Sequence, residues 1–330
     1  MPDTGSRPVP RPAPPHGNRP PHATAVRVER PAGPQVAGPM RAVIRCEPDR
    51  QGKHGLVPAS GYRAGGSRFG PGSNALIMLN RIGIYEAGQP GQADAGRVKL
   101  ADAGKRAVVR WACEQELGQH AELIAAVGRR RDLALRAMRR DGHRPCRVVR
   151  LLASPEWRLA VGLGSNVNAH EVGLALHGTY GWPVIPGSSL KGLALAWARS
   201  SPEVKPDDVE RVFGTASHVG SVGFLDAMPA GRAVTVEADV LTPHVKPYYD
   251  SVANGTGRSL VPPAEYHNPV PVIFLTVRGT YAVDLYGPER DDLKLAAGWL
   301  RQAGDELGAK TAAGYGYLTV QPAPGWPETT

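Results

Sequence analysis

The chain has 330 residues, of which 42% are hydrophobic, and a formal net charge of +9 at pH 7. This length and composition suffice for one large or two modest domains with a hydrophobic core, and they exclude a collagen, a coiled coil and a membrane protein. No run approaches the roughly 18 apolar residues that a membrane span needs, and the N-terminus carries arginine and proline where a signal peptide has an apolar core, so we expect a cytoplasmic protein.

The charge is distributed unequally along the chain. Residues 1–150 carry 26 Lys and Arg against 12 Asp and Glu, whereas residues 151–330 carry 13 against 18. A basic half joined to a nearly neutral half indicates a surface for a polyanion, and the planar guanidinium group of arginine suits phosphate. The alternative is that a high-GC genome enriches Arg, Ala, Gly and Pro without any functional demand.

Residues 1–72 are rich in Pro, Gly and Arg and have no sustained apolar period, so we expect a disordered or extended arm. Residues 73–330 are predicted to form the folded body. We divide this body into an N-terminal strand and basic helical segment, residues 73–145, and a core, residues 146–330.

The N-terminal part of the body contains two predicted elements. Residues 74–86 are apolar enough for a strand or a short buried element, and residues from about 108 to 140 are predicted to be helical. Six arginines crowd the end of this helix, at positions 129, 130, 131, 136, 139 and 140. Cations near a helix C-terminus are favourable, but six in twelve residues exceed what capping requires. We therefore expect Arg130, Arg136, Arg139 and Arg140 to face phosphate, with a solvated face as the alternative.

The core begins with two short apolar runs in residues 146–164, which indicate strands. A helix is predicted next, with Ser188 or Ser189 as its N-cap and an end near residue 200. Lys191 lies in the first turn, where the helix dipole disfavours a cation and the free N–H groups favour an anion. A bound phosphate would satisfy both. The segment matches neither the GxxxxGK[S/T] nor the GxGxxG pattern of nucleotide-binding loops.

The remaining elements follow in order. Residues 212–229 are predicted to form a loop and a strand, residues 233–250 a strand that ends in an aromatic and basic loop, and residues 268–287 a β-hairpin through Arg278 and Gly279. Residues 290–308 are predicted to form an amphipathic helix, before a glycine-rich loop and a last strand. This βαββαβ order predicts an α+β, ferredoxin-like and RRM-like fold, with an antiparallel sheet and helices on one face.

Five blocks in this order resemble the RAMP superfamily of CRISPR RNA-binding proteins. They are IPGSSLKG, FGTASHVGSVGFLDAMP, DVLTPHVKPYY, NPVPVIFLTV and GAKTAAGYGYL. The blocks are most similar to the family that supplies the sixth subunit of the Cmr effector complex in type III-B systems. The resemblance spans about residues 74–320 and is strongest from residue 162 onward, whereas the Pro-rich N-terminal extension departs from the family pattern.

The resemblance implies a non-catalytic RNA-binding subunit of a type III-B, Cmr-type ribonucleoprotein in antiviral defence. Such a subunit binds the CRISPR guide RNA and its complementary target RNA beside other RAMP subunits of the Cmr complex. It also implies that Ser188, Ser189 and Lys191, together with the glycine-rich loop of residues 308–316, lie near the RNA backbone.

The glycine-rich loop agrees with that role, because glycine brings backbone N–H groups close to phosphate without interference from a Cβ atom. Within it, Lys310 adds a charge and Thr311 a hydroxyl, between the flexible positions Gly314 and Gly316. Tyr315, like Tyr317, is a candidate for stacking on a base; the alternative is that alternate residues of a strand pack in the protein.

Residues 242–259 mix cations and aromatic rings, which suits single-stranded RNA. His244, Lys246 and Tyr248 are the candidates there, and Arg199, off the apolar stripe of its helix, is another. A contact with another subunit explains the same residues equally well, because tyrosine is enriched at protein interfaces.

A catalytic or metal-binding role has candidate side chains, but none has the spacing of a metal motif. They are His170, His177, His218, His244, Asp226, Asp239 and Asp250. The three cysteines form no CxxC pair. We therefore expect no enzyme activity, no metal and no cofactor. A RAMP-type endoribonuclease and a nonspecific nucleic-acid-binding assembly protein are the alternatives.

Overall fold

The structure is a computed structural model that describes residues 33–36, 44–58, 74–87, 98–114, 117, 121–140, 146–164, 169–231, 234–253, 261–304 and 306–326. These residues belong to one compact unit, residues 32–330. Of the predicted N-terminal arm, residues 1–32, 37–43 and 59–72 lie outside the described residues.

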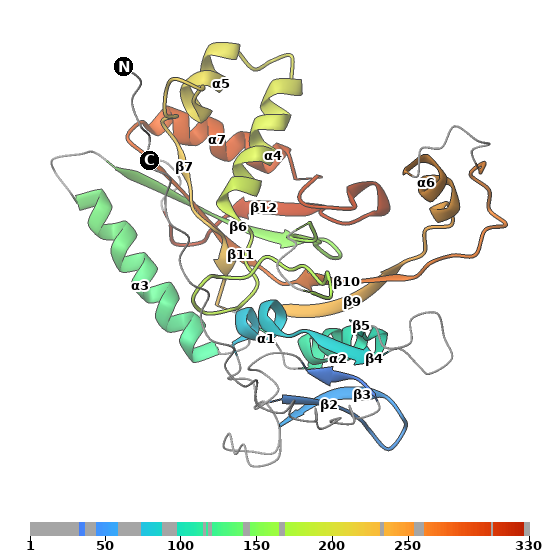
Figure 1. Ribbon diagram of the computed structural model, residues 1–330. Coiled ribbons are helices and arrows are strands. Elements are labelled where there is room, and N and C mark those ends of the chain that lie inside the picture. The colour runs from blue at the N-terminus through green and yellow to red at the C-terminus, as the bar shows by residue number, and fades with distance from the viewer. Residues whose placement is uncertain are drawn as a thin grey trace, which may run out of the picture. The chain divides into compact units, whose positions relative to one another are not determined.

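The central sheet has the strand order β12-β6-β11-β7, with every pair antiparallel (Figure 1). A short strand, β8, also pairs with β11. The bounds of the five strands are β6 Arg147–Pro155, β7 Gly223–Phe224, β8 Met228–Pro229, β11 Tyr281–Gly287 and β12 Leu318–Pro322. α4 (Gly187–Ser200) connects β6 to β7 across β11, and α7 (Arg290–Gln302) connects β11 to β12 across β6. This is the split βαβ arrangement, so the predicted α+β, ferredoxin-like core is confirmed.

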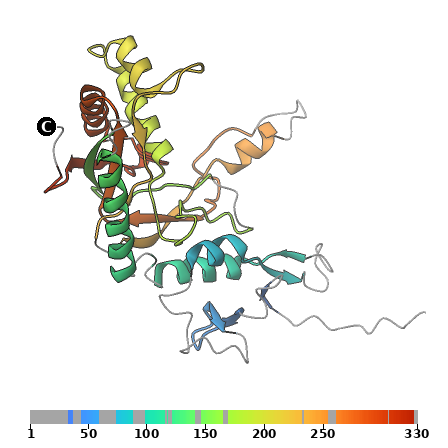
Figure 2. The ribbon, with the colours of Figure 1, turned by 90° about the vertical axis from the view of Figure 1, so that its left-hand side faces the viewer.

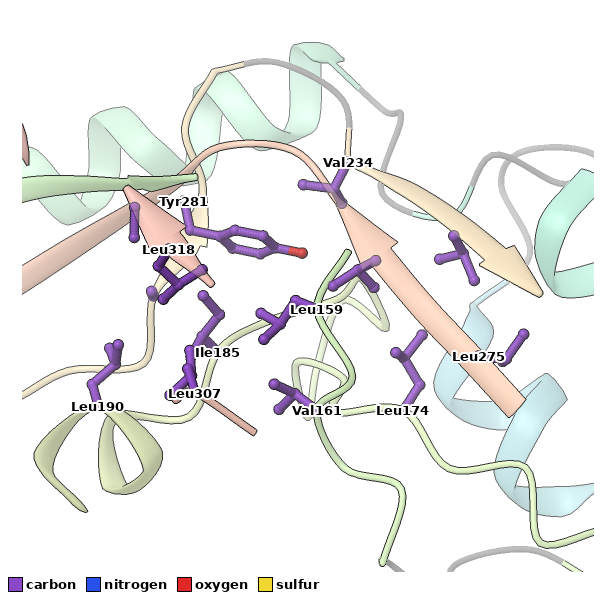
Figure 3. Close-up of a cluster of buried hydrophobic side chains, with 14 of the residues drawn as sticks. Leu159, Val161, Leu174, Ile185, Leu190, Val234, Leu275, Tyr281, Leu307 and Leu318 are labelled. Atoms are coloured by element: carbon purple, nitrogen blue, oxygen red, sulfur yellow. The ribbon is translucent and has the colours of Figure 1, made fainter. Parts of the chain in front are cut away.

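The two core helices pack on one face of this sheet, and α5 (Pro206–Phe213) packs beside them. Alternate strand residues point to the same face, so Val149, Leu151 and Ala153 of β6 meet the apolar side of α7. Leu190 of α4 belongs to the same buried cluster, and Figure 3 shows it near Leu307.

The opposite face of the sheet carries a third helix, α3 (Ala121–Arg140). Arg150 alternates with the buried leucines and valines of β6 and therefore points to the other side, where it bonds to Asp132 of α3. Figure 2 shows α3 on the side of the sheet that faces the viewer. α3 is thus an addition to the predicted core, in which both helices lie on one face.

β9 (Thr235–Leu241) and β10 (Val272–Arg278) form a separate two-stranded ribbon. The predicted hairpin in residues 268–287 is therefore wrong, because β10 pairs with β9 while β11 pairs with β6. The chain changes sheets at Gly279, whose φ of 130° lies in a region that residues other than glycine rarely adopt. The segment between the ribbon strands, predicted as a loop, contains the helix α6 (Lys246–Ala253).

The N-terminal part also differs from the prediction. The described strands are β1 Gln35–Val36, β2 Ile44–Pro48, β3 His54–Pro58, β4 Ile84–Ala87 and β5 Val98–Leu100, and the helices are α1 Ala75–Arg81 and α2 Asp102–Glu114. Residues 74–86 thus hold a helix and a strand, because Asn74 caps α1 by accepting the N–H of Leu76 at 2.9 Å. The predicted helix of residues 108–140 is two helices, α2 and α3.

The predicted boundary at residue 72 is wrong for residues 44–58. β2 and β3 form a hairpin, and Ile44 is completely buried. In β2, Ile44 and Cys46 are buried while Arg45 and Glu47 are exposed, which is the period of a half-buried strand. The surrounding Pro- and Gly-rich composition hid this short alternation.

Candidate nucleic-acid interface

The start of α4 is held by an acidic side chain from a later loop. The helix begins at Gly187, and its N-cap, Pro186, has no side-chain hydrogen bond. The predicted caps Ser188 and Ser189 are inside the first turn instead. The Oδ1 atom of Asp226 accepts the N–H of Gly187 at 2.8 Å, so a carboxylate of the protein occupies part of the place that the sequence assigned to phosphate.

Lys191 also has a partner inside the protein. Its Nζ atom donates to the carbonyl oxygen of Phe213, the last residue of α5, at 2.7 Å. A cation is favoured at a helix C-terminus, so the end of α5 offsets the unfavourable position of Lys191 at the start of α4. The inference that this lysine needs a phosphate is therefore wrong. An ammonium group has three donors, so a contact with RNA stays a prediction.

A groove of about 860 Å³ opens beside the start of α4, and we call it the α4 groove. Its wall includes Ser188 and Lys191 from α4, Met138 from the C-terminal end of α3, and Tyr286 from β11. Gly220, Gly223 and Gly287 are also among its lining residues, and the ring of Tyr286 lies against Gly223. The groove thus brings the start of α4 and the basic end of α3 to one place.

The glycine-rich loop, residues 308–316, is anchored at both ends by backbone hydrogen bonds. Ala309 donates to the carbonyl oxygen of Ala160 at 2.8 Å, and Gly316 donates to that of Arg158 at 3.0 Å. Between these anchors, Lys310 is exposed and has a left-handed backbone conformation with φ of 66°. The loop also contains a short 3-10 helix, η2 (Thr311–Ala313). Lys310 is therefore presented to solvent on a fixed backbone.

Two residues of the loop have internal structural roles. Tyr315 is 4% exposed, and its hydroxyl donates to Oδ2 of Asp239 at 2.6 Å. Burial and this bond raise the pKa of Tyr315 to about 12. Its ring is packed within the protein, so stacking of Tyr315 on a base, as predicted, is wrong for this structure. Gly316 is required by packing, because a Cβ atom there would lie 2.0 Å from the carbonyl oxygen of Leu307. Gly314, by contrast, faces open space.

The arginines of α3 separate into exposed and buried groups. Arg129, Arg130, Arg136 and Arg139 are exposed, and we call them the arginine face. No carboxylate of a described residue forms an ion pair with any of these four. The side chain of Arg140 lies outside the described residues. Within the described part of the chain, the arginine face is therefore a cationic surface without paired carboxylates.

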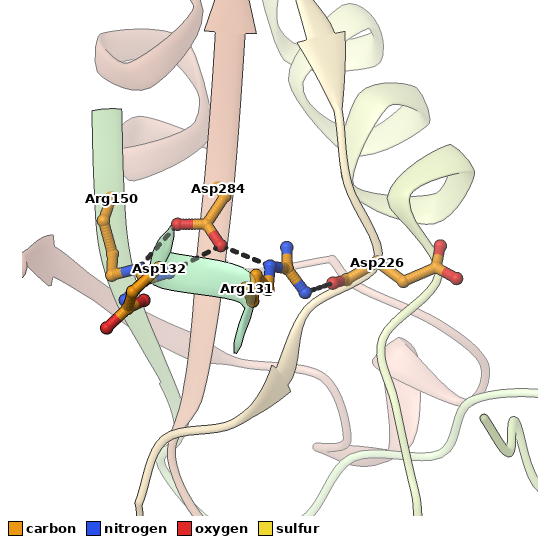
Figure 4. Close-up of polar contacts among 5 residues, drawn as sticks. All are labelled: Arg131, Asp132, Arg150, Asp226 and Asp284. Atoms are coloured by element: carbon orange, nitrogen blue, oxygen red, sulfur yellow. Dashed lines mark hydrogen bonds and ion pairs between the residues drawn. The ribbon is translucent and has the colours of Figure 1, made fainter. Parts of the chain in front are cut away.

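Arg131, in contrast, belongs to a buried ion network that attaches α3 to the sheet (Figure 4). Its Nε atom lies 2.6 Å from Oδ2 of Asp284, which is completely buried on β11. Arg150 of β6 donates from Nε to Oδ1 of Asp284 and from Nη1 to Asp132, both at 2.6 Å. Burial lowers the pKa of Arg150, but the two carboxylates outweigh this and raise it above the usual value. Two cations and two carboxylates thus balance, and the helix is fixed in place.

The candidate RNA-binding residues of the segment 242–259 lie on α6 and just before it. This helix is at the end of the β9–β10 ribbon away from the central sheet (Figure 1). His244 is exposed, Lys246 forms an ion pair with Asp250 one turn later, and the ring of Tyr248 contacts that of Tyr249. Arg199 is exposed in the last turn of α4, about 12 Å along the helix from Lys191 at 1.5 Å per residue. The predicted residues therefore form several separate surfaces and not one site.

The candidate catalytic residues have structural partners in most cases. His170 is buried and accepts the N–H of Ile84, Asp226 caps α4, and Asp239 bonds to Arg158 and Tyr315. Burial lowers the pKa of His170, so its neutral form is favoured. Among the residues that the structure describes, no group of three or more His, Cys, Asp and Glu side chains is placed to hold a metal ion.

Trp157, which follows β6 and is 44% exposed, is not among the residues predicted from the sequence. Asp284 and its arginine partners are not among them either. A signal for Trp157 is present in the sequence, because this tryptophan stands between two charged residues, Glu156 and Arg158. No local pattern marks Asp284, whose partners are more than a hundred residues away.

Comparisons with known proteins give a family and a fold. The model of the RAMP superfamily matches residues 154–319. The chain is similar to the CRISPR system Cmr subunit Cmr6 of Pyrococcus furiosus, with 27% identity over a 225-residue alignment that covers 49% of this chain and 64% of that protein. The chain thus covers less than two thirds of that relative's length.

The fold is similar to that of a chain in the cryo-EM structure of the type III-B Cmr-beta complex bound to cognate target RNA. The TM-score is 0.50 with 20% sequence identity, over 65% of this chain and 71% of that chain. At this level of identity the likeness concerns the fold alone.

Proposed function

The chain belongs to the RAMP superfamily, and on this premise we propose that it is a non-catalytic RNA-binding subunit of a type III-B, Cmr-type CRISPR ribonucleoprotein. In this role it holds the guide RNA and its complementary target RNA in antiviral defence, beside other RAMP subunits and in the cytoplasm. The observation that carries the proposal is the similarity to Cmr6 of Pyrococcus furiosus, which is 27% identical in the aligned region.

The surface of the described residues supports contact with a nucleic-acid backbone. The arginine face of α3 is exposed and has no ion pair with a described carboxylate, and Met138 near its end lines the α4 groove together with Ser188 and Lys191. Lys310 is exposed on the anchored glycine-rich loop. Cations suit phosphates, and phosphates carry no sequence information. This is expected for a protein that leaves sequence recognition to base pairing.

The absence of catalysis is part of the proposal. Cleavage of RNA needs a positioned acid and base or a metal ion. Asp226 and Asp239 are engaged in structural hydrogen bonds, and His170 is buried. These partners support a role in binding.

The proposal includes no membrane partner. Within the described ranges, no helix is long and apolar enough to span a bilayer.

A binding and cleavage assay with the full chain tests this function. We expect it to bind a labelled, repeat-derived guide RNA more tightly than an unrelated RNA of the same length, and to leave both intact in Mg²⁺ or Mn²⁺. Cleavage that EDTA abolishes would contradict the proposal and favour the endoribonuclease. Equal affinity for both RNAs, lost steeply with salt, would favour a nonspecific assembly protein.

A further inference from the structure

Trp157 lies directly against the glycine-rich loop, although 150 residues separate them in sequence. The residue before it, Glu156, donates its backbone N–H to the carbonyl oxygen of Tyr317 at 2.9 Å. The residue after it, Arg158, accepts the N–H of Gly316 at 3.0 Å. Trp157 is thus held on both sides to the loop that carries the exposed Lys310.

The indole ring rests on two supports. The ring centroid of Tyr315 lies 4.9 Å from that of Trp157, at an interplanar angle of 34°, and the guanidinium carbon of Arg158 lies 5.0 Å from the Trp157 centroid. The Tyr315 hydroxyl and Nη1 of Arg158 both bond to the same atom, Oδ2 of Asp239, at 2.6 Å each. The two supports of the indole are therefore joined to each other through one carboxylate oxygen.

Trp157 is 44% exposed, so part of its indole ring stays accessible to a ligand although the ring is packed on two supports. Its supports are fixed by Asp239 and by Glu237, which lies 2.7 Å from Nη2 of Arg158. A ligand that stacks on the exposed part of the ring therefore meets a side chain whose orientation is already set. Little conformational entropy of Trp157 is lost on binding.

The surroundings favour a nucleobase over a protein partner. Glu156, next to Trp157 in sequence, and Lys310, on the loop that packs against Trp157, are exposed and charged, and Tyr317 is the exposed aromatic residue bonded to Glu156. A protein interface generally needs a contiguous apolar patch, whereas one aromatic ring beside a cation suffices for one nucleotide, with the base on the ring and the phosphate at the cation. The positive charge of Arg158 is compensated by the carboxylates of Glu237 and Asp239.

We infer that Trp157 is a stacking platform for one unpaired base of the bound RNA, beside a phosphate contact at Lys310. This inference rests on the proposed function and adds to it a residue and a class of ligand, an unstacked nucleobase. The contact is with the π face of the base, which all four bases have, so we expect Trp157 to stack on any of them.

The test uses the full chain and a labelled single-stranded RNA of 12 nucleotides, together with a set of the same RNA in which one position at a time is abasic. The variants are Trp157→Ala and Trp157→Phe, the second keeping an aromatic ring. We expect Trp157→Ala to weaken binding roughly 5- to 150-fold and Trp157→Phe to recover most of it. An abasic ribose at one position should weaken the wild type by a similar factor, and should cost Trp157→Ala nothing further.

The outcomes separate the inference from the proposed function. If the wild type does not bind the RNA, both fail. If the wild type binds and Trp157→Ala binds equally tightly, or if every abasic position costs the variant as much as it costs the wild type, only the stacking inference fails. Unchanged RNA affinity with loss of copurifying subunits would instead assign Trp157 to a protein interface. If Trp157→Ala does not fold, Trp157→Phe provides the test. We expect this variant to keep its affinity for RNA, while the quenching of its tryptophan emission by RNA is smaller than in the wild type. Unchanged quenching would overturn the inference.

Discussion

Lys191 and Asp226 show how single residues at the start of α4 can be both structural and available to a ligand. Asp226 accepts the first N–H of the helix, and Lys191 donates to the end of α5. Each contact uses only part of the available hydrogen-bond donors. The ammonium of Lys191 has three N–H donors, and a helix start has four N–H groups without a partner inside the helix. Ser188, exposed in the α4 groove, offers a further hydroxyl.

Replacement of Lys191 by alanine tests its contact with RNA. We expect Lys191→Ala to weaken binding by the same factor for every guide sequence and to lower the slope of log affinity against log salt by about 1, because phosphate contacts carry no sequence information. The measurement is RNA affinity at several salt concentrations, with Lys294→Ala, an exposed position on α7, as the control. A large loss for one sequence alone would argue against a phosphate contact.

Gly316 and Gly314 form a matched pair for testing how the glycine-rich loop is built. Their φ angles are similar, 82° and 89°, but a Cβ atom at Gly316 would lie 2.0 Å from the Leu307 carbonyl oxygen while one at Gly314 meets nothing within 4 Å. We expect Gly314→Ala to cost about 1 kcal/mol of unfolding free energy and Gly316→Ala about 1–3 kcal/mol more. Urea unfolding measures both, and equal losses would show that only the backbone conformation matters.

The elements show where the sequence is informative and where it is not. The amphipathic patterns that end near residue 200 and span residues 290–308 predicted α4 and α7, because burial of one face dictates the period of a helix. α4 begins slightly earlier than predicted, at Gly187, and α7 ends earlier, at Gln302. Pairing is a long-range property, so the adjacent segments β10 and β11 were mistaken for a hairpin although each pairs with a distant strand. Tyr315 was placed on the surface because its packing partners, Trp157 and Phe274, come from elsewhere in the chain.

The attachment of α3 to the sheet depends on one buried carboxylate. Asp284 is the carboxylate that pairs with Arg131, and its removal leaves Arg150 with Asp132, so we expect Asp284→Ala to lower the unfolding free energy by about 3–5 kcal/mol. The control is Asp250→Ala, which removes an exposed ion pair on α6 and should cost no more than about 1 kcal/mol. Denaturant unfolding gives both values, and a similar small loss for each variant would contradict a structural role for the buried network.

At the scale of the whole molecule, the excess of positive charge in the N-terminal half of the chain is partly displayed on one exposed surface, the arginine face. The net charge of residues 1–150 arises largely from arginines, and those of α3 divide between the buried network and the arginine face only once α3 is folded onto the sheet. The sequence could therefore predict a polyanion partner but not which arginines meet it. The arrangement of the candidate residues on separate surfaces fits a long ligand better than a small one.

The arginine face provides a test at this scale. Changing its four arginines to glutamine should lower the salt slope by up to about 3, since each phosphate contact with a single strand contributes about 0.7. The charge-matched control changes four other exposed cations, Arg81, Arg106, Lys294 and Arg301. We expect that control to bind nearly as the wild type does; equal losses in both variants would mean that only net charge matters.

The most direct test of the central claim is to purify the tagged full chain from its native host, sequence the RNA and identify the proteins that come with it. The account predicts repeat-derived guide RNAs of defined length together with other RAMP subunits. Recovery of the chain alone, or with RNA of unselected sequence and no RAMP partner, would contradict it.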